Sequence, residues 1–176
     1  MADFDVFFPL LLKFEGGFVD NPHDPGGATN MGITMKTFDS CCQELLGVAP
    51  TLDNLRCIDE AQAHVIYKKL YWDTIHCDQI TSQDLGNILC DFYVNAGAHA
   101  TRLLQTVLND MGGNLKVDGD LGPVSLALLA SLDQSEVYRR YKTGRIEYYQ
   151  NLVKEDPSQG VFLHGWLNRV NAFPDV

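Results

Sequence analysis

Apolar residues recur at helical spacing along most of this sequence, and one interruption of that pattern constrains the fold more than any other feature. Residues 16–34 read GGFVDNPHDPGGATNMGIT, a run rich in glycine, proline, asparagine and aspartate. These residue types favour turns over regular helices. We therefore predict a mainly α protein, a helical bundle in which a small β-hairpin or an irregular loop follows the first helix.

Helices are predicted on both sides of this interruption. The first covers about residues 3–14, and the longest covers about residues 135–154. The expected helix-end signals are an N-cap at Thr34, a stop at Gly47, a capping box of Asp59 with Gln62, a variant box of Thr81 with Asp84, and Pro123 in a first turn.

The charge balance and the apolar patterning exclude two classes of partner. Asp and Glu outnumber Lys and Arg by 23 to 13, which gives a formal net charge of −10 at pH 7. Because this balance leaves no basic footprint for DNA or RNA, we expect no nucleic-acid binding. No stretch reaches the ~18 consecutive apolar residues of a membrane helix, so we also expect no stable membrane insertion.

The cysteines and the N-terminus indicate a protein made in a reducing compartment. Five cysteines are present, two of them adjacent, with no C-x-x-C motif, so we expect reduced thiols that are mostly buried. The first residues carry two acids and no basic segment, which is unlike a secretory signal. At 176 residues, the chain is expected to fold as one compact domain, in which two lobes could share a core.

Glu15 is the strongest candidate for a catalytic residue. It ends the first predicted helix, where the negative end of the helix dipole, the neighbouring aromatic rings and nearby aspartates all oppose its ionisation. Such a carboxyl group keeps its proton near neutral pH, as a general acid must. Asp24 follows nine positions later and Thr29 five after that. A protonated Glu facing an ionised Asp can cleave a glycosidic bond, and Thr29 could hold the water.

A structural interpretation of the same residues stays open. Gly16 and Gly17 form an ordinary helix stop whether or not Glu15 is catalytic, and Asp24 could simply make a turn with its own backbone.

Residues 15–34 resemble the signature of glycoside hydrolase family 108, the lysozyme-like N-acetylmuramidases of phage and bacteria that include proteins called secretion activators. The similarity continues through residues 71–73, 91–97, 104–105, 117–123 and 165–170. The C-terminal part is similar to the peptidoglycan-binding domain that accompanies this family. The resemblance implies a lysozyme-like α+β fold, with a catalytic region at 1–90 and a helical peptidoglycan-binding region at 91–176, packed as one globular unit.

The resemblance also assigns roles to particular residues. Glu15 matches the family's catalytic acid, and the order Glu15, Asp24, Thr29 is similar to that of phage-type lysozymes. Asp20 matches a position that is usually acidic or amide, so it is a substrate-binding candidate that competes with Asp24 for the second carboxylate role.

Three further substrate-binding candidates lie in the second half of the chain. Asp91 and Asn95 are four residues apart and share one helix face. They could hydrogen-bond the N-acetyl or hydroxyl groups of sugars or orient the hairpin, or else form an ordinary polar surface or a buried structural bond. Tyr93 could stack on a sugar ring or belong to the core.

The resemblance implies a peptidoglycan hydrolase that cleaves the β-1,4 bond between N-acetylmuramic acid and N-acetylglucosamine in glycan strands, as an endolysin does. We expect a monomer with no cofactor and no metal. Synthesis would be cytoplasmic, without a signal peptide, and action in the periplasm or cell wall would follow lysis or export through a holin or dedicated machinery.

Two alternatives remain. The acidic balance favours a non-catalytic peptidoglycan-binding or secretion-assisting protein, because wall polymers are often anionic. A metal-dependent amidase that uses His23 and Asp24 is the third interpretation, although Pro22 and Pro25 restrict that loop and no fourth ligand is evident.

Overall fold

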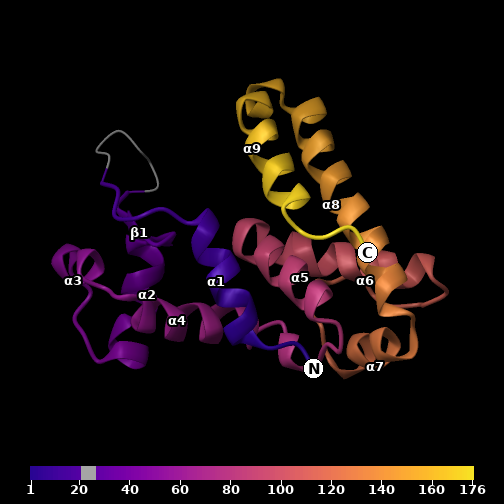
Figure 1. The fold of residues 1–176 in the computed structure, drawn as a ribbon, viewed down its shortest axis with the longest axis horizontal. Helices are drawn as coiled ribbons and strands as arrows, with labels where there is room; N and C mark the ends of the chain where they lie inside the picture. Colours follow the sequence, from indigo (N-terminus) through magenta and orange to yellow (C-terminus); the bar gives the residue numbers. More distant parts are fainter. Residues whose placement is uncertain (21–26) are drawn as a thin grey trace. The chain divides into compact units, whose positions relative to one another are not determined.

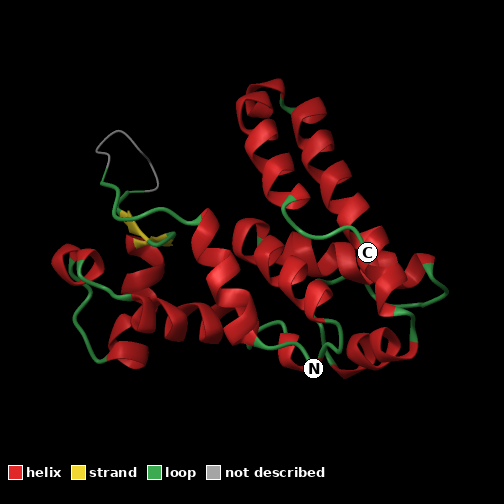
Figure 2. Cartoon of the chain, in the orientation of Figure 1, coloured by secondary structure: helices red, strands yellow, loops and turns green. Residues whose placement is uncertain are grey.

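A computed structural model describes residues 1–20 and 27–176, and these residues form mostly helices together with one short two-stranded sheet (Figures 1 and 2). The prediction of a mainly α, lysozyme-like fold with a small hairpin after the first helix is confirmed. The chain divides into two compact units. The N-terminal unit comprises residues 4–74, and the C-terminal unit comprises residues 1–3 and 75–176.

The N-terminal unit contains the hairpin and four α-helices among its described residues. Its elements are α1 (Phe4–Phe14), β1 (Thr29–Asn30), β2 (Ile33–Thr34), α2 (Met35–Leu46), α3 (Leu52–Arg56), α4 (Glu60–Tyr67) and the π-helical segment η1 (Lys68–Trp72).

Local capping explains where α2 and α4 begin and where α2 ends. The Thr34 side chain accepts a hydrogen bond from the Thr37 backbone, and Gly47 ends α2 with a left-handed φ of 68°. Asp59 and Gln62 form the predicted capping box at the start of α4. All three predictions are confirmed.

The C-terminal unit is entirely helical apart from its connections. Its elements are the short 3₁₀ helix η2 (Cys77–Gln79), α5 (Gln83–Ala96), α6 (Ala98–Asp110), α7 (Pro123–Ser131), α8 (Gln134–Glu155), the 3₁₀ turn η3 (Pro157–Gln159) and α9 (Gly160–Asn171). Helix α8 packs against α5, α6 and α9. Pro123 occupies the first turn of α7 as predicted. The start of α5 was predicted wrongly, because Ser82 rather than Thr81 caps it, accepting a hydrogen bond from the Leu85 backbone.

Each unit has its own apolar core. In the N-terminal unit Trp72 is buried and its ring stacks on Phe7 with the centroids 5.6 Å apart. In the C-terminal unit eight consecutive residues of α5, from Leu85 to Phe92, are buried, so this helix is covered on nearly every side.

The cysteines and helix lengths bear on two of the predictions. Cys57 is exposed and the other four thiols are buried, all of them unpaired, as expected. None of the helices in residues 1–20 and 27–176 is both long and apolar enough to cross a membrane.

Candidate active site

A tight hairpin turn forms the centre of the candidate site. Thr29 pairs with Thr34 and Asn30 with Ile33, which leaves Met31 and Gly32 as the two-residue connection. Both have positive φ values, 47° at Met31 and 76° at Gly32, the conformation of the turn that best matches strand twist. A left-handed conformation is uncommon for a methionine and requires support from its surroundings.

A second backbone pairing fixes the other side of β1. Val19 and Thr29 exchange two hydrogen bonds, each 2.8 Å long, from the N–H of one residue to the carbonyl of the other. Thr29 is half-buried, and Asp20, directly after Val19, is exposed. Asp24 and His23 lie outside the described residues.

The carboxyl group of Glu15 lies directly against the hairpin turn. Glu15 follows the last residue of α1 and is half-buried. A Cβ atom placed on Gly32 would lie 2.7 Å from Cδ of Glu15 and 2.6 Å from the Tyr67 hydroxyl, and still closer to Oε2 of Glu15. Only a glycine fits here, both because of its φ and because the Glu15 carboxyl and the Tyr67 hydroxyl already occupy the space.

Two hydrogen-bonded contacts hold this turn from other parts of the unit. Tyr67, the last residue of α4, is buried and its hydroxyl donates to the carbonyl oxygen of Met31 at 2.8 Å. The Asn30 side chain donates to the carbonyls of Leu55 and Arg56 at 3.0 and 3.1 Å. These contacts satisfy a buried amide and fix the strained residue, so the surface facing Glu15 is preorganised.

Gly32 and Tyr67 are the two site residues that the sequence interpretation missed. The sequence offered one signal for the turn. Asn-Met-Gly lies between the β-forming residues Thr29 and Ile33, which is close to the pattern of a two-residue hairpin. No local pattern could connect Tyr67 to the turn, since the two are 36 residues apart.

Phe18, one of the rings expected to lie near Glu15, makes a different contact. The guanidinium of Arg56 lies over the Phe18 ring, 4.7 Å from its centroid. This cation–π contact is favourable and joins the segment before β1 to the end of α3.

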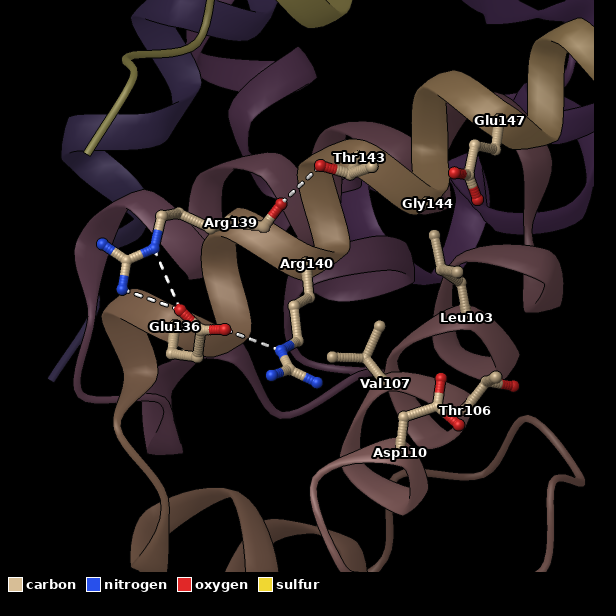
Figure 3. Close-up of a pocket in the computed structure, with 10 residues that line it drawn as sticks. All are labelled: Leu103, Thr106, Val107, Asp110, Glu136, Arg139, Arg140, Thr143, Gly144 and Glu147. Carbon is tan, nitrogen blue, oxygen red and sulfur yellow. Dashed lines mark hydrogen bonds and ion pairs between the residues drawn. The ribbon is translucent and has the colours of Figure 1, made fainter.

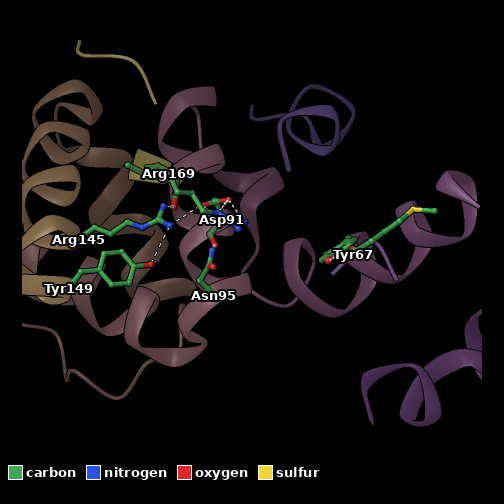
Figure 4. Close-up of polar contacts among 8 residues, drawn as sticks. Tyr67, Asp91, Asn95, Arg145, Tyr149 and Arg169 are labelled. Carbon is green, nitrogen blue, oxygen red and sulfur yellow. Dashed lines mark hydrogen bonds and ion pairs between the residues drawn. The ribbon is translucent and has the colours of Figure 1, made fainter. Parts of the chain in front are cut away.

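Asp91 forms a buried ion pair with two arginines in the C-terminal unit. Its Oδ2 accepts a hydrogen bond from Nη2 of Arg145 at 2.7 Å, and its Oδ1 accepts from Nη2 and Nε of Arg169 at 2.8 and 3.0 Å (Figure 4). Asp91 and Arg145 are both 0% exposed. These are the contacts of a buried structural bond, one of the two alternatives for this residue, and they join α5, α8 and α9.

The other two candidates on α5 are nearer the surface. Asn95 is exposed and its side chain donates to the Asp91 carbonyl at 2.6 Å. Tyr93 is half-buried, and its burial raises the pKa of its hydroxyl. Their roles in substrate binding stay predictions.

The described residues hold no group of three or more His, Cys, Asp or Glu side chains arranged to bind a metal ion. At the hairpin the described residues place a carboxyl group beside a hydroxyl group and a backbone turn, an arrangement suited to proton transfer to a bound molecule.

Comparisons with known proteins find a family match for each of the two halves of the sequence. Residues 8–97 match the family described as Glycosyl hydrolase 108, and residues 99–171 match the family described as Predicted Peptidoglycan domain. The solved structure of SagA from Brucella abortus is 26% identical, with a TM-score of 0.71, and the match covers 97% of this chain and 94% of that chain. None of the curated proteins is a significant match. Because residues 8–97 are more than half of the sequence, this chain belongs to the glycosyl hydrolase 108 family.

Proposed function

We propose that this protein is an N-acetylmuramidase that cleaves the β-1,4 bond between N-acetylmuramic acid and N-acetylglucosamine in peptidoglycan. The family points to a glycosidase, and the second match points to peptidoglycan as the partner. The observation that carries the proposal is the Glu15 carboxyl group held against Gly32 and Tyr67 at the hairpin turn.

In the proposed mechanism, Glu15 donates its proton to the glycosidic oxygen as the bond to the sugar carbon breaks. Asp24, or Asp20, supports the positive charge that develops on that carbon or removes a proton from the attacking water. Thr29 holds the water with its hydroxyl. The rigid turn contributes by keeping the Glu15 carboxyl at one position relative to the bound sugar, since a misplaced acid loses much of its effect.

We propose a catalytic role for residues 1–90 and a wall-binding role for residues 91–176. The two family matches, residues 8–97 and 99–171, support this order of the two roles and meet near residue 98. We propose a monomer that is made in the cytoplasm and acts in the periplasm or cell wall, after lysis or with a holin or export machinery. Asp20, Tyr93, Asn95 and Asp91 remain substrate-binding proposals, and for Asp91 only an indirect role through its arginines fits its burial.

The test is hydrolysis by a Glu15→Gln variant. Purified protein should clear a peptidoglycan suspension and release new reducing ends. Loss of the general acid should slow this by about 10²- to 10⁴-fold. Because Gln has nearly the same shape as Glu, the melting temperature should change little. A Glu15→Gln variant that lyses as fast as the wild type would exclude this mechanism.

A second candidate is a protein that binds peptidoglycan without cutting it, or that assists secretion. The net charge of −10 favours it over an efficient lysin, because wall polymers are often anionic and efficient lysins tend to be basic. Sedimentation with insoluble peptidoglycan, followed by a reducing-sugar assay of the supernatant, separates the two. Binding without released reducing ends supports the second candidate.

A further inference from the structure

A groove with a volume of about 490 Å³ lies between α6 and α8 in the C-terminal unit (Figure 3). This volume is within the usual range of ligand pockets, roughly 300–1,000 Å³. Gly144 lets α8 approach α6 closely at the groove, because a Cβ atom there would lie 2.8 Å from the Leu103 side chain. Leu103 and Val107, one turn apart on α6, form the apolar part of its wall.

One end of the groove presents a guanidinium group that is held by an ion pair. Glu136 accepts hydrogen bonds from Nη2 of Arg139 at 2.8 Å and from Nε of Arg140 at 2.7 Å. The bond through Nε orients Arg140, and Figure 3 shows its two terminal nitrogens directed toward Val107 and Asp110. No described residue forms a hydrogen bond with these nitrogens. Two parallel N–H groups of this kind match the geometry of a carboxylate.

The other end of the groove presents a carboxylate. Glu147 is exposed and lies seven residues after Arg140, two turns along the same face of α8. At 1.5 Å per residue, the two are about 10 Å apart along the helix axis. An extended peptide advances about 3.3 Å per residue, so the groove matches a peptide of roughly three residues that carries a carboxylate and an amine.

The lining also argues against a sugar ring as the occupant. The ten residues that line the groove include no aromatic side chain. Its walls instead combine acidic and basic side chains with a small apolar area. Such a lining complements a short peptide that carries both a carboxylate and an amine.

We propose that this groove binds the short peptide side chains of peptidoglycan, with a peptide carboxylate on Arg140 and a peptide amine on Glu147. Peptidoglycan carries such peptides, with free carboxylates and a primary amine, on its glycan strands. The inference rests on the proposed function only for the choice of polymer. Binding of the peptide requires no bond cleavage, so it can hold or fail separately from hydrolysis.

The test is calorimetric titration of the full chain with the soluble tripeptide L-alanyl-γ-D-glutamyl-meso-diaminopimelate. Arg140→Gln and Glu147→Gln should each weaken binding about tenfold, since each removes a charge-assisted contact. Arg102→Gln is the matched control, because Arg102 is an exposed arginine on α6 outside the groove. The same tripeptide with amidated carboxylates should bind as weakly to the wild type as the tripeptide does to Arg140→Gln.

Three results would overturn the proposal. The first is no binding of the tripeptide to the wild type, and the second is an equal loss of tripeptide affinity in Arg140→Gln and Arg102→Gln. The third is that Arg140→Gln weakens binding of a chitin tetrasaccharide as much as it weakens binding of the tripeptide. Hydrolysis measured on the same variants keeps the two proposals separate. If Glu15→Gln still hydrolyses peptidoglycan while the wild type binds the tripeptide, only the muramidase mechanism is refuted. If the wild type hydrolyses peptidoglycan but does not bind the tripeptide, only the assignment of this groove is refuted.

Discussion

Replacing Gly32 by alanine should damage the candidate site in two separable ways. The first is backbone strain, because φ at Gly32 is 76° and a left-handed conformation costs an L-residue about 1–2 kcal/mol. The second is collision, because the new Cβ would lie 2.6 Å from the Tyr67 hydroxyl and 2.7 Å from Cδ of Glu15. Carbon atoms prefer about 3.5–4.0 Å, so these groups must retreat by about 1 Å.

The size of the effect follows from those two terms. Overpacking of this kind typically costs about 1–3 kcal/mol. The free energy of unfolding should therefore fall by about 2–5 kcal/mol in Gly32→Ala, the sum of strain and collision. A displacement of about 1 Å at a catalytic group can cost about 10²-fold in rate, so hydrolysis should fall by about that factor under conditions where the variant is folded.

Gly47→Ala is the matched control. Gly47 has nearly the same φ, 68°, but no atom lies within 4 Å of the Cβ that an alanine would add. This variant should lose only the strain term, about 1–2 kcal/mol, and keep wild-type hydrolysis. Urea unfolding measures the free energy of unfolding of each variant. Release of reducing ends from peptidoglycan by the folded proteins, at one temperature, measures hydrolysis.

The comparison of the two alanine variants decides the question. If Gly32→Ala and Gly47→Ala lose the same stability and the same activity, then the contact between Gly32 and Glu15 has no functional consequence. In that case the turn does not position Glu15 for catalysis.

Three further predictions concern the C-terminal unit and the thiols. Asp91→Asn should lower the free energy of unfolding by about 3–5 kcal/mol, because it leaves Arg145 and Arg169 without their buried counter-ion. Denaturant unfolding measures this loss, and a loss below about 1 kcal/mol would contradict a structural role for Asp91. Burial raises the pKa of Tyr141 well above its usual value, so its hydroxyl stabilises the fold fully below pH ~10 and less as the pH rises further. Tyr141→Phe should therefore show a shallower loss of stability above pH ~10, by up to about 1.4 kcal/mol per pH unit, and equal slopes would refute this. In native protein a thiol reagent should label Cys57 rapidly and the four buried thiols only after unfolding, and fast labelling of more than one thiol would disagree with the structure.

Helix ends governed by neighbouring residues could be predicted from the sequence. Thr34, Gly47 and the Asp59–Gln62 pair act through hydrogen bonds to backbone groups three or four positions away, so their residue types are sufficient to locate them. The start of α5 was harder, because Thr81 and Ser82 are both good caps. In the structure Ser82 is the cap, and its backbone N–H donates to the Gln134 side chain on α8.

Elements that depend on tertiary packing could not be predicted in the same way. The short α3 and the final α9 were not expected, and the π-helical turn at Lys68–Trp72 has no signal in hydrophobic spacing. The sequence left burial of Asp91 open as one of several alternatives and could not decide between them. The apolar stripe of α5 suggested a polar opposite face, but that face is covered as well, and a carboxylate is tolerated there because two arginines on α8 and α9 neutralise it.

The candidate site shows the same division between local and distant causes. Glu15 could be identified because its position at a helix end beside two glycines is a local feature. Its surroundings depend on distant contacts. A hairpin with strands of two residues is too short to be stable alone, so its stability must come from outside. Asn30 reaches the end of α3 and Tyr67 reaches back from α4, and together they fix a turn whose first residue, Met31, adopts a conformation that methionine rarely takes. Strain that persists only because its surroundings enforce it is typical of functional sites. Here it lies at the turn residue next to Gly32, against which the Glu15 carboxyl rests, so a change at Asn30 would reach the proposed acid through the backbone, whereas a change at Tyr67 would also alter the space beside the carboxyl group itself.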